Sequence, residues 1–172
     1  MRKCLSAALA ALLFTVVVPA ASAGGFELGV GANYWYSIDE AKDHSFDRDG
    51  LGWMISCRLP LSQLLALGLE VEQSPDNFVF LEEKLYLPAA YLILGDTVYA
   101  GLGVGTYYYD DDFYGDVWYA LRAGFKIPII PRALVLDINA NYRVENWDGI
   151  KSARDDVDTD TLMIGAALRL VF

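Results

Sequence analysis

The chain has 172 residues, of which 55% are hydrophobic, and a formal net charge of −10. This length fits one domain, and the acidic balance excludes a nucleic-acid partner, because such a partner requires a basic patch. Cysteine occurs twice, at Cys4 and Cys57.

The amino terminus predicts a secretory signal peptide. A positive start, Met1-Arg2-Lys3, precedes an apolar run over 5–18 and an Ala-Ser-Ala cleavage site over 21–23. The apolar run is shorter than the ~20 residues that a membrane-spanning helix needs. We therefore expect a cleaved leader over 1–23 and a single domain over 24–172, with 11 basic and 23 acidic residues, a net charge of −12. Cys57 would be its one cysteine, so no disulfide could form within it.

The first four predicted strands cover 26–38, 51–59, 65–73 and 78–94, each with side chains alternating at period two. The first two are separated by a charged loop over 39–50. The fourth is the least regular: we assign Leu87, Tyr91 and Ile93 to its outer face and Glu82 and Lys84 to its inner face. Pro88 cannot donate a ladder hydrogen bond and predicts a bulge or bend within that strand.

The last four predicted strands cover 97–109, 117–127, 134–147 and 161–172. The seventh alternates without error, and the eighth has one fully apolar face and one face of small or charged residues. Long polar connections, over 110–116 and 148–160, alternate with short ones.

This arrangement predicts an all-β fold, an eight-stranded antiparallel up-and-down transmembrane β-barrel. Each strand has the ~9–11 residues required to cross a bilayer when tilted. A sheet in lipid cannot leave an edge open, so the first strand should pair with the last. The short connections would be periplasmic and the long ones extracellular.

The strands of a soluble eight-stranded calyx also alternate apolar and polar side chains, so other features must distinguish a soluble barrel from a transmembrane one. Glycines concentrate on the polar face, where they leave room inside a narrow barrel. Aromatic residues at strand ends near the long loops resemble an interfacial girdle; they are Tyr34, Tyr36, Trp53, Phe78, Phe80, Tyr108, Tyr142 and Trp147. Both features favour a barrel in a membrane.

The whole of 24–172 resembles the small eight-stranded outer-membrane barrels of Gram-negative bacteria, the group of OmpX, the OmpA transmembrane domain and OmpW. The signal peptide and the alternating strand 161–172, which ends on Phe172, carry the resemblance. It implies an outer-membrane location with periplasmic termini, contact with outer-membrane lipids and lipopolysaccharide, and recognition of Phe172 by the barrel-assembly machinery.

The inner face is predicted to hold six cations and six carboxylates. Buried charges must be paired, so this set predicts either a salt-bridged plug or a selective polar pore. An eight-stranded barrel is just wide enough for its own side chains, which favours the plug. The predicted lumen network is Glu27, Arg58, Glu70, Glu72, Glu82, Lys84, Arg122, Lys126, Asp137, Arg143, Glu145 and Arg169.

Most of the remaining acidic residues lie in the long connections. Solvation and repulsion between neighbouring molecules explain them most simply, and we predict no metal site. The candidates for divalent cation binding would be Asp110, Asp111, Asp112 and Asp116, whose carboxylates suit Ca²⁺ or Mg²⁺, although no twelve-residue calcium loop is present. The loops could also contact an extracellular partner.

We predict no catalytic residues and no cofactor. The set His44, Ser74 and Asp76 has the chemistry for acyl transfer, but the His-x-Ser-Asn run of lipid A deacylases and the amphipathic amino-terminal helix of palmitoylating barrels are both missing. Cys57 is predicted to face lipid. The expected function is a structural or surface-interaction barrel, with a narrow channel for small or apolar solutes as the alternative and a lipid A acyltransferase or deacylase as the third choice.

Overall fold

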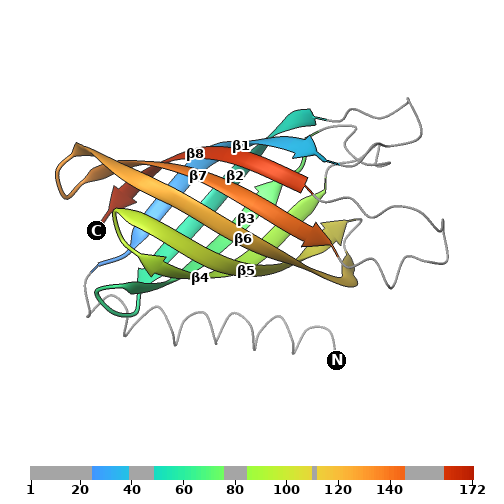
Figure 1. Cartoon of the computed structure of the whole chain (residues 1–172), viewed down its shortest axis with the longest axis horizontal. Helices are drawn as coiled ribbons and strands as arrows, with labels where there is room; N and C mark the ends of the chain where they lie inside the picture. The colour runs from blue at the N-terminus through green and yellow to red at the C-terminus, as the bar shows by residue number, and fades with distance from the viewer. Residues whose placement is uncertain (1–24, 39–48, 76–84, 110–111, 146–160) are drawn as a thin grey trace.

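The computed structural model describes residues 25–38, 49–75, 85–109, 112–145 and 161–172. They form a closed barrel (Figure 1) of eight strands. The strands are β1 (Glu27–Ser37), β2 (Asp49–Pro60), β3 (Leu65–Gln73), β4 (Tyr86–Gly95), β5 (Val98–Tyr109), β6 (Asp112–Ile130), β7 (Leu134–Glu145) and β8 (Thr161–Val171). Among these residues there is no helix of the length and apolarity that a membrane span requires.

Every strand pairs antiparallel with its neighbour in the sequence, and β1 also pairs with β8 from Glu27↔Val171 to Ser37↔Thr161. The predicted fold class is therefore confirmed. The turns at 61–64, 96–97 and 131–133 and the end of β8 lie at one end of the barrel, hereafter the short-turn end. The other end, hereafter the loop end, is where β1 finishes and β2 begins (Figure 1).

The barrel is apolar outside and polar inside, the reverse of a soluble calyx. Outward side chains such as Val30, Ile55, Leu102 and Ile164 are exposed, whereas Asn33, Glu72, Asp137 and Arg143 are fully buried. An apolar outer surface around a closed hydrogen-bonded sheet satisfies what a bilayer demands of a spanning structure.

The prediction for β4 was wrong in its faces. Among the described residues the strand begins at Tyr86, after Leu85, and residues 78–84 of the predicted strand lie outside the description. Leu87, Tyr91 and Ile93 point into the barrel and are buried, while Leu92 is exposed. Most residues from 85 to 94 are apolar at both parities, so the alternation itself carried little information about which face was which.

The connection between β5 and β6 is also shorter than predicted. Residues 112–116 belong to β6, and Tyr109 pairs with Asp112 across a two-residue connection. The ladder shifts register between Thr106 and Tyr107. Aromatic residues have high strand propensity, and Phe113 and Tyr114 extend the hairpin past the acidic residues that suggested a loop.

Glycines make room for large rings inside the barrel. A Cβ atom on Gly103 would overlap the ring of Tyr91, and one on Gly105 would overlap the ring of Trp118. In both cases the glycine is the direct cross-strand partner of the ring-bearing residue. The lumen is thus filled by pairing small residues with large ones on neighbouring strands.

The end of the chain closes the barrel seam. The rings of Phe26 and Phe172 stack with centroids 4.7 Å apart. The Phe172 backbone N–H donates to the Phe26 carbonyl at 3.0 Å. Both residues lie at the short-turn end, where β1 starts and β8 ends (Figure 1).

Because the outer surface is apolar, the cost of placing a charge on it should depend on the depth of that residue in the bilayer. Leu121 lies halfway along β6 and Ile129 near its end, with similar exposures of 54% and 51%. Leu121→Arg should lower the free energy of unfolding by about 2–4 kcal/mol, because the charge would sit at the bilayer midplane, and Ile129→Arg by only about 0–1 kcal/mol. Urea unfolding in lipid vesicles measures both; equal losses would contradict a transmembrane orientation.

Candidate functional site: the charged lumen

Nearest the loop end, the lumen is crossed by an ion pair between Arg143 on β7 and Glu72 on β3, with Nη2 and Oε2 3.0 Å apart. The other Glu72 oxygen accepts hydrogen bonds from Asn33 Nδ2 and Trp35 Nε1, each at 2.7 Å. Glu72 thus joins β1, β3 and β7 through its carboxylate, and charge-assisted bonds of this kind are the strong ones.

The Arg143 guanidinium lies between two indole rings. Its carbon is 3.9 Å from the centroid of the Trp118 ring and 4.6 Å from that of Trp35. Trp118, Trp35 and Arg143 are all buried. Cation–π contacts strengthen when they are desolvated, so this layer, the Arg143 layer, is held by stacking as well as by charge.

The next layer toward the short-turn end is centred on Arg122 of β6. Its two terminal nitrogens bind both oxygens of Glu70 at 2.9 and 2.7 Å, and its Nε donates to Asn141 Oδ1 at 2.5 Å. The guanidinium also lies 3.8 Å from the centroid of the Tyr91 ring. Two parallel hydrogen bonds to one carboxylate fix the arginine side chain in position across the lumen.

A third layer joins β8, β7, β5 and β2. Arg169 Nε donates to Asp137 Oδ2 at 2.5 Å, and its Nη1 donates to Ser56 Oγ at 3.1 Å. The Tyr99 hydroxyl donates to the other Asp137 oxygen at 2.6 Å. Asp137 therefore has one partner on each oxygen, as a fully buried carboxylate requires.

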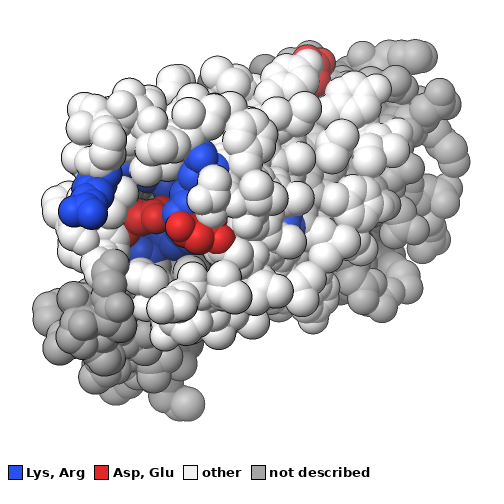
Figure 2. Space-filling view, turned by 60° about the vertical axis from the view of Figure 1, so that its left-hand side comes forward, with Lys and Arg blue, Asp and Glu red and all other residues white. Residues whose placement is uncertain are grey.

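The opening at the short-turn end is lined by a fourth group, the mouth cluster of Lys126, Glu27, Asp96 and Arg58. Lys126 Nζ bonds Glu27 Oε1 at 2.8 Å and Asp96 Oδ1 at 2.5 Å. Arg58 Nη2 donates to the Gly95 carbonyl at 2.9 Å, and its guanidinium lies 4.7 Å from the Tyr99 ring centroid. Figure 2 shows charged side chains of both signs gathered in a hollow of the barrel.

The structure brings nine of the twelve predicted lumen charges into these layers. Glu82 and Lys84 lie outside the described residues, and the alternation that assigned them to the lumen is reversed from Tyr86 onward. Glu145 ends β7, with its side chain outside the description. The nine placed residues are Glu27, Arg58, Glu70, Glu72, Arg122, Lys126, Asp137, Arg143 and Arg169.

Sequence reasoning missed part of the aromatic framework around these charges. Tyr91 was assigned to lipid, and Trp118 was assigned to neither face. A signal was present: Tyr91 has Gly68 and Gly103 opposite it on its two neighbouring strands, and Trp118 has Gly105. A glycine directly across from a ring marks an inward ring in so narrow a barrel.

The other candidate residues form no site among the described residues. His44, Asp76, Asp110 and Asp111 lie outside the description, and Asp112 and Asp116 are part of β6. Within the described ranges, no three acidic, histidine or cysteine residues are grouped as metal ligands would be. Cys57 is a free, half-buried thiol.

Solved structures with this architecture match most of the chain. Neisserial surface protein A matches with a TM-score of 0.58 and 15% identity, over 86% of this chain and 97% of that one. The fold is that of a transmembrane barrel. Ail, the attachment invasion locus protein of Yersinia pestis, and the amino-terminal barrel of Pseudomonas aeruginosa OprF each match with a TM-score of 0.51 and 14% identity, over 87% of this chain and 99% of theirs. No protein-family model and no curated protein sequence matches the chain.

The Arg122–Glu70 pair generates a stability prediction. Glu70→Gln removes the carboxylate that the buried guanidinium binds through two hydrogen bonds, and should cost about 3–5 kcal/mol of unfolding free energy. The double variant Glu70→Gln/Arg122→Met should recover most of that loss, because no unpaired charge remains. Asp96→Asn is the control: its side chain is 68% exposed, so the loss should stay below about 1 kcal/mol. Equilibrium unfolding that ranks the three differently would contradict this assignment.

Proposed function

We propose that the chain is an integral outer-membrane protein whose lumen is closed by its own side chains and whose function is carried out by the loop end. The observation that carries this proposal is the stack of lumen layers. The Arg143 and Arg122 layers each place a buried guanidinium, a carboxylate and at least one aromatic ring across the same narrow cross-section. A lumen filled in this way leaves the loops as the part available to partners.

The orientation follows from the asymmetry of the barrel. Short turns and the chain end share one end, which we assign to the periplasm. The exposed apolar belt would contact outer-membrane lipids and, in the outer leaflet, lipopolysaccharide. Phe172 would act as the signal for the barrel-assembly machinery, and its exposed, stacked position at the chain end is compatible with that role.

The loop end would face the cell exterior with a strongly acidic surface, which suits contact with a basic or cationic extracellular partner. Two of the similar structures are named a surface protein and an attachment invasion locus protein. These names make a surface-interaction role the first to test. The proposal includes no enzymatic step.

Location and orientation can be tested together. In sucrose-gradient fractionation of the producing cells, the protein should sediment with the outer membrane. Protease added to intact cells should cut within 39–48 or 146–160 and leave the turns at 61–64 and 131–133 uncut until the cells are permeabilised. Cleavage at the short turns of intact cells would reverse the orientation.

Closure of the lumen is tested by conductance in a planar bilayer. Refolded residues 24–172 should give no discrete current steps, because ion-paired side chains are stacked across the lumen. A general porin refolded in the same way supplies the positive control. Steady current steps of constant size would contradict the proposal that the lumen is closed.

A narrow channel is the second candidate, and the hollow in Figure 2 is the observation that favours it. In that case the ion selectivity of the current should change in Arg122→Gln, a residue of the lumen interior, and stay the same in Arg132→Gln, an exposed residue of a short turn.

A further inference from the structure

The hairpin of β6 and β7 extends past its neighbours at the short-turn end. The β5–β6 ladder reaches only as far as Phe125, and beyond it the Lys126 N–H donates to the Thr97 carbonyl at 2.7 Å. Among the described residues, the rest of β6 pairs with β7 alone. Figure 1 shows this hairpin reaching farther than the other short turns. Residues 127–133, hereafter the hairpin tip, are exposed at every position.

The unpaired edge of the hairpin does not suit another strand. Lys126 turns its N–H toward β5, so Pro128, two residues further along the strand, turns its nitrogen toward the same unpaired side. Proline has no N–H to donate, and proline on an exposed edge opposes strand addition. A second copy of the chain or an extended peptide is therefore a poor fit for this edge.

The side chains of the hairpin tip continue the apolar belt to the rim of the barrel. Ile127, Ile129 and Ile130 are all exposed. Ile127 and Ile129 follow Leu121 and Phe125 on the outward face of β6, and those two residues are exposed as well. The surface of the hairpin tip is thus continuous with the face that the bilayer covers.

Arg132 has an unusual backbone conformation within the hairpin tip. The Ala133 N–H donates to the Ile130 carbonyl at 3.0 Å and closes a turn with Pro131 and Arg132 at its centre. The φ angle of Arg132 is 62°, and no other described non-glycine residue has a positive φ. Glycine or asparagine is preferred at such a turn position, because a Cβ atom is strained there. A strained residue of this kind is a reason to look for a function.

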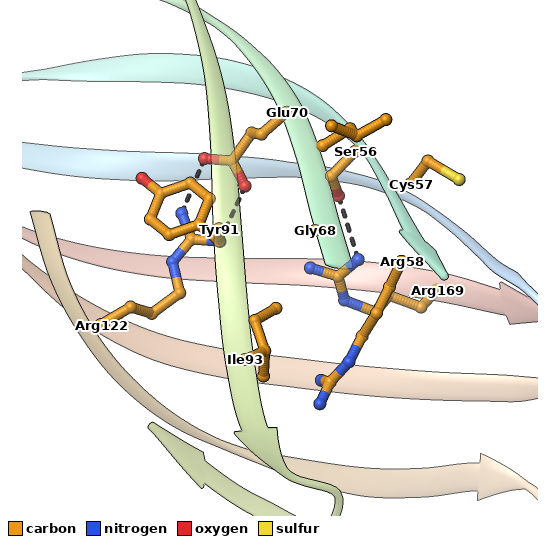
Figure 3. A pocket seen from close by; sticks show the side chains of 10 residues that line it. Ser56, Cys57, Arg58, Gly68, Glu70, Tyr91, Ile93, Arg122 and Arg169 are labelled. Atoms are coloured by element: carbon orange, nitrogen blue, oxygen red, sulfur yellow. Dashed lines mark hydrogen bonds and ion pairs between the residues drawn. The ribbon is translucent and has the colours of Figure 1, made fainter. Parts of the chain in front are cut away.

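The Arg132 side chain also differs from the arginines of the lumen. Those drawn in Figure 3 are held by protein groups: Arg122 binds both oxygens of Glu70, and Arg169 donates to Ser56. Arg132 is exposed and, among the described residues, has neither an ion pair nor a side-chain hydrogen bond. The hairpin tip therefore combines three exposed isoleucines with one cation that no described carboxylate neutralises.

We propose that the hairpin tip binds the headgroup of an anionic phospholipid in the leaflet that the short-turn end faces. The isoleucines pack against acyl chains, and the Arg132 guanidinium donates two N–H groups to the lipid phosphate at the bilayer surface. Continuity with the apolar belt favours a lipid over a soluble partner. The site rests on the membrane location of the barrel, and it is independent of the closed lumen and of any partner of the loop end.

The test is equilibrium unfolding in urea of the protein refolded in phosphatidylcholine vesicles, with and without phosphatidylglycerol. A lipid that binds the native state stabilises it, so the wild-type urea midpoint should rise with the fraction of phosphatidylglycerol. Arg132→Gln should lose most of this rise, and Arg132→Lys should keep part of it. No rise in the wild type, or an equal rise in Arg132→Gln, would overturn the site.

Arg132→Gly separates backbone strain from lipid binding. In pure phosphatidylcholine its midpoint should lie above that of the wild type, because glycine adopts a positive φ without a Cβ atom. Phosphatidylglycerol should then leave this midpoint almost unchanged, so that the difference from the wild type narrows. A glycine variant that responds to phosphatidylglycerol as the wild type does would contradict the assignment of the headgroup to Arg132.

Asp96→Asn is the matched control, because it changes the charge of another exposed turn at the same end and should keep the wild-type rise. A loss as large as that in Arg132→Gln would show a general effect of the variants and overturn the site. Inorganic phosphate added to phosphatidylcholine vesicles should leave the wild-type midpoint unchanged; a rise equal to that with phosphatidylglycerol would assign the site to free phosphate instead. Both leaflets of the vesicles have the same composition, so a reversed orientation or a conducting lumen would leave these results unaltered.

Discussion

The requirement that every charge inside a closed, narrow barrel find a partner within that barrel governs the rest of this structure. Eight strands enclose just enough space for side chains, so the lumen cations cannot be solvated as they would be in a wide pore. Arg122 and Arg143 meet this requirement in the same manner, each with a carboxylate of β3 and an aromatic face. The free energy lost when these guanidinium groups leave water is offset by their ion pairs and ring contacts inside the lumen.

Steric pairing makes this electrostatic arrangement possible. Arginine, tryptophan and tyrosine side chains fit inside the barrel because glycines stand opposite many of them: Gly101 opposite Arg122, Gly105 opposite Trp118 and Gly124 opposite Tyr99. Filling of this kind favours a structural platform over a solute path, and it directs attention to the loop end.

The carboxylates connect strands that the hydrogen-bonded ladder does not join. Glu72 on β3 contacts β1 and β7, and Glu70 on β3 contacts β6, across the barrel. These bonds therefore brace the barrel through its interior, in addition to the sheet that surrounds it. Arg58 is the exception to this bracing, because among the described residues it donates to the Gly95 carbonyl and to no carboxylate.

The sequence by itself determined the number of strands, their antiparallel order, the apolar outer face and the inward position of Arg122, Asp137 and Arg169, because period-two alternation is a local property of each strand. It could not determine the face of Tyr91, since β4 is apolar at both parities, nor the extent of β6. Only the tertiary structure decided which cation meets which carboxylate. Arg122 and Glu70 are 52 residues apart, on strands that are not neighbours, and their contact depends on the closure, register and diameter of the whole barrel.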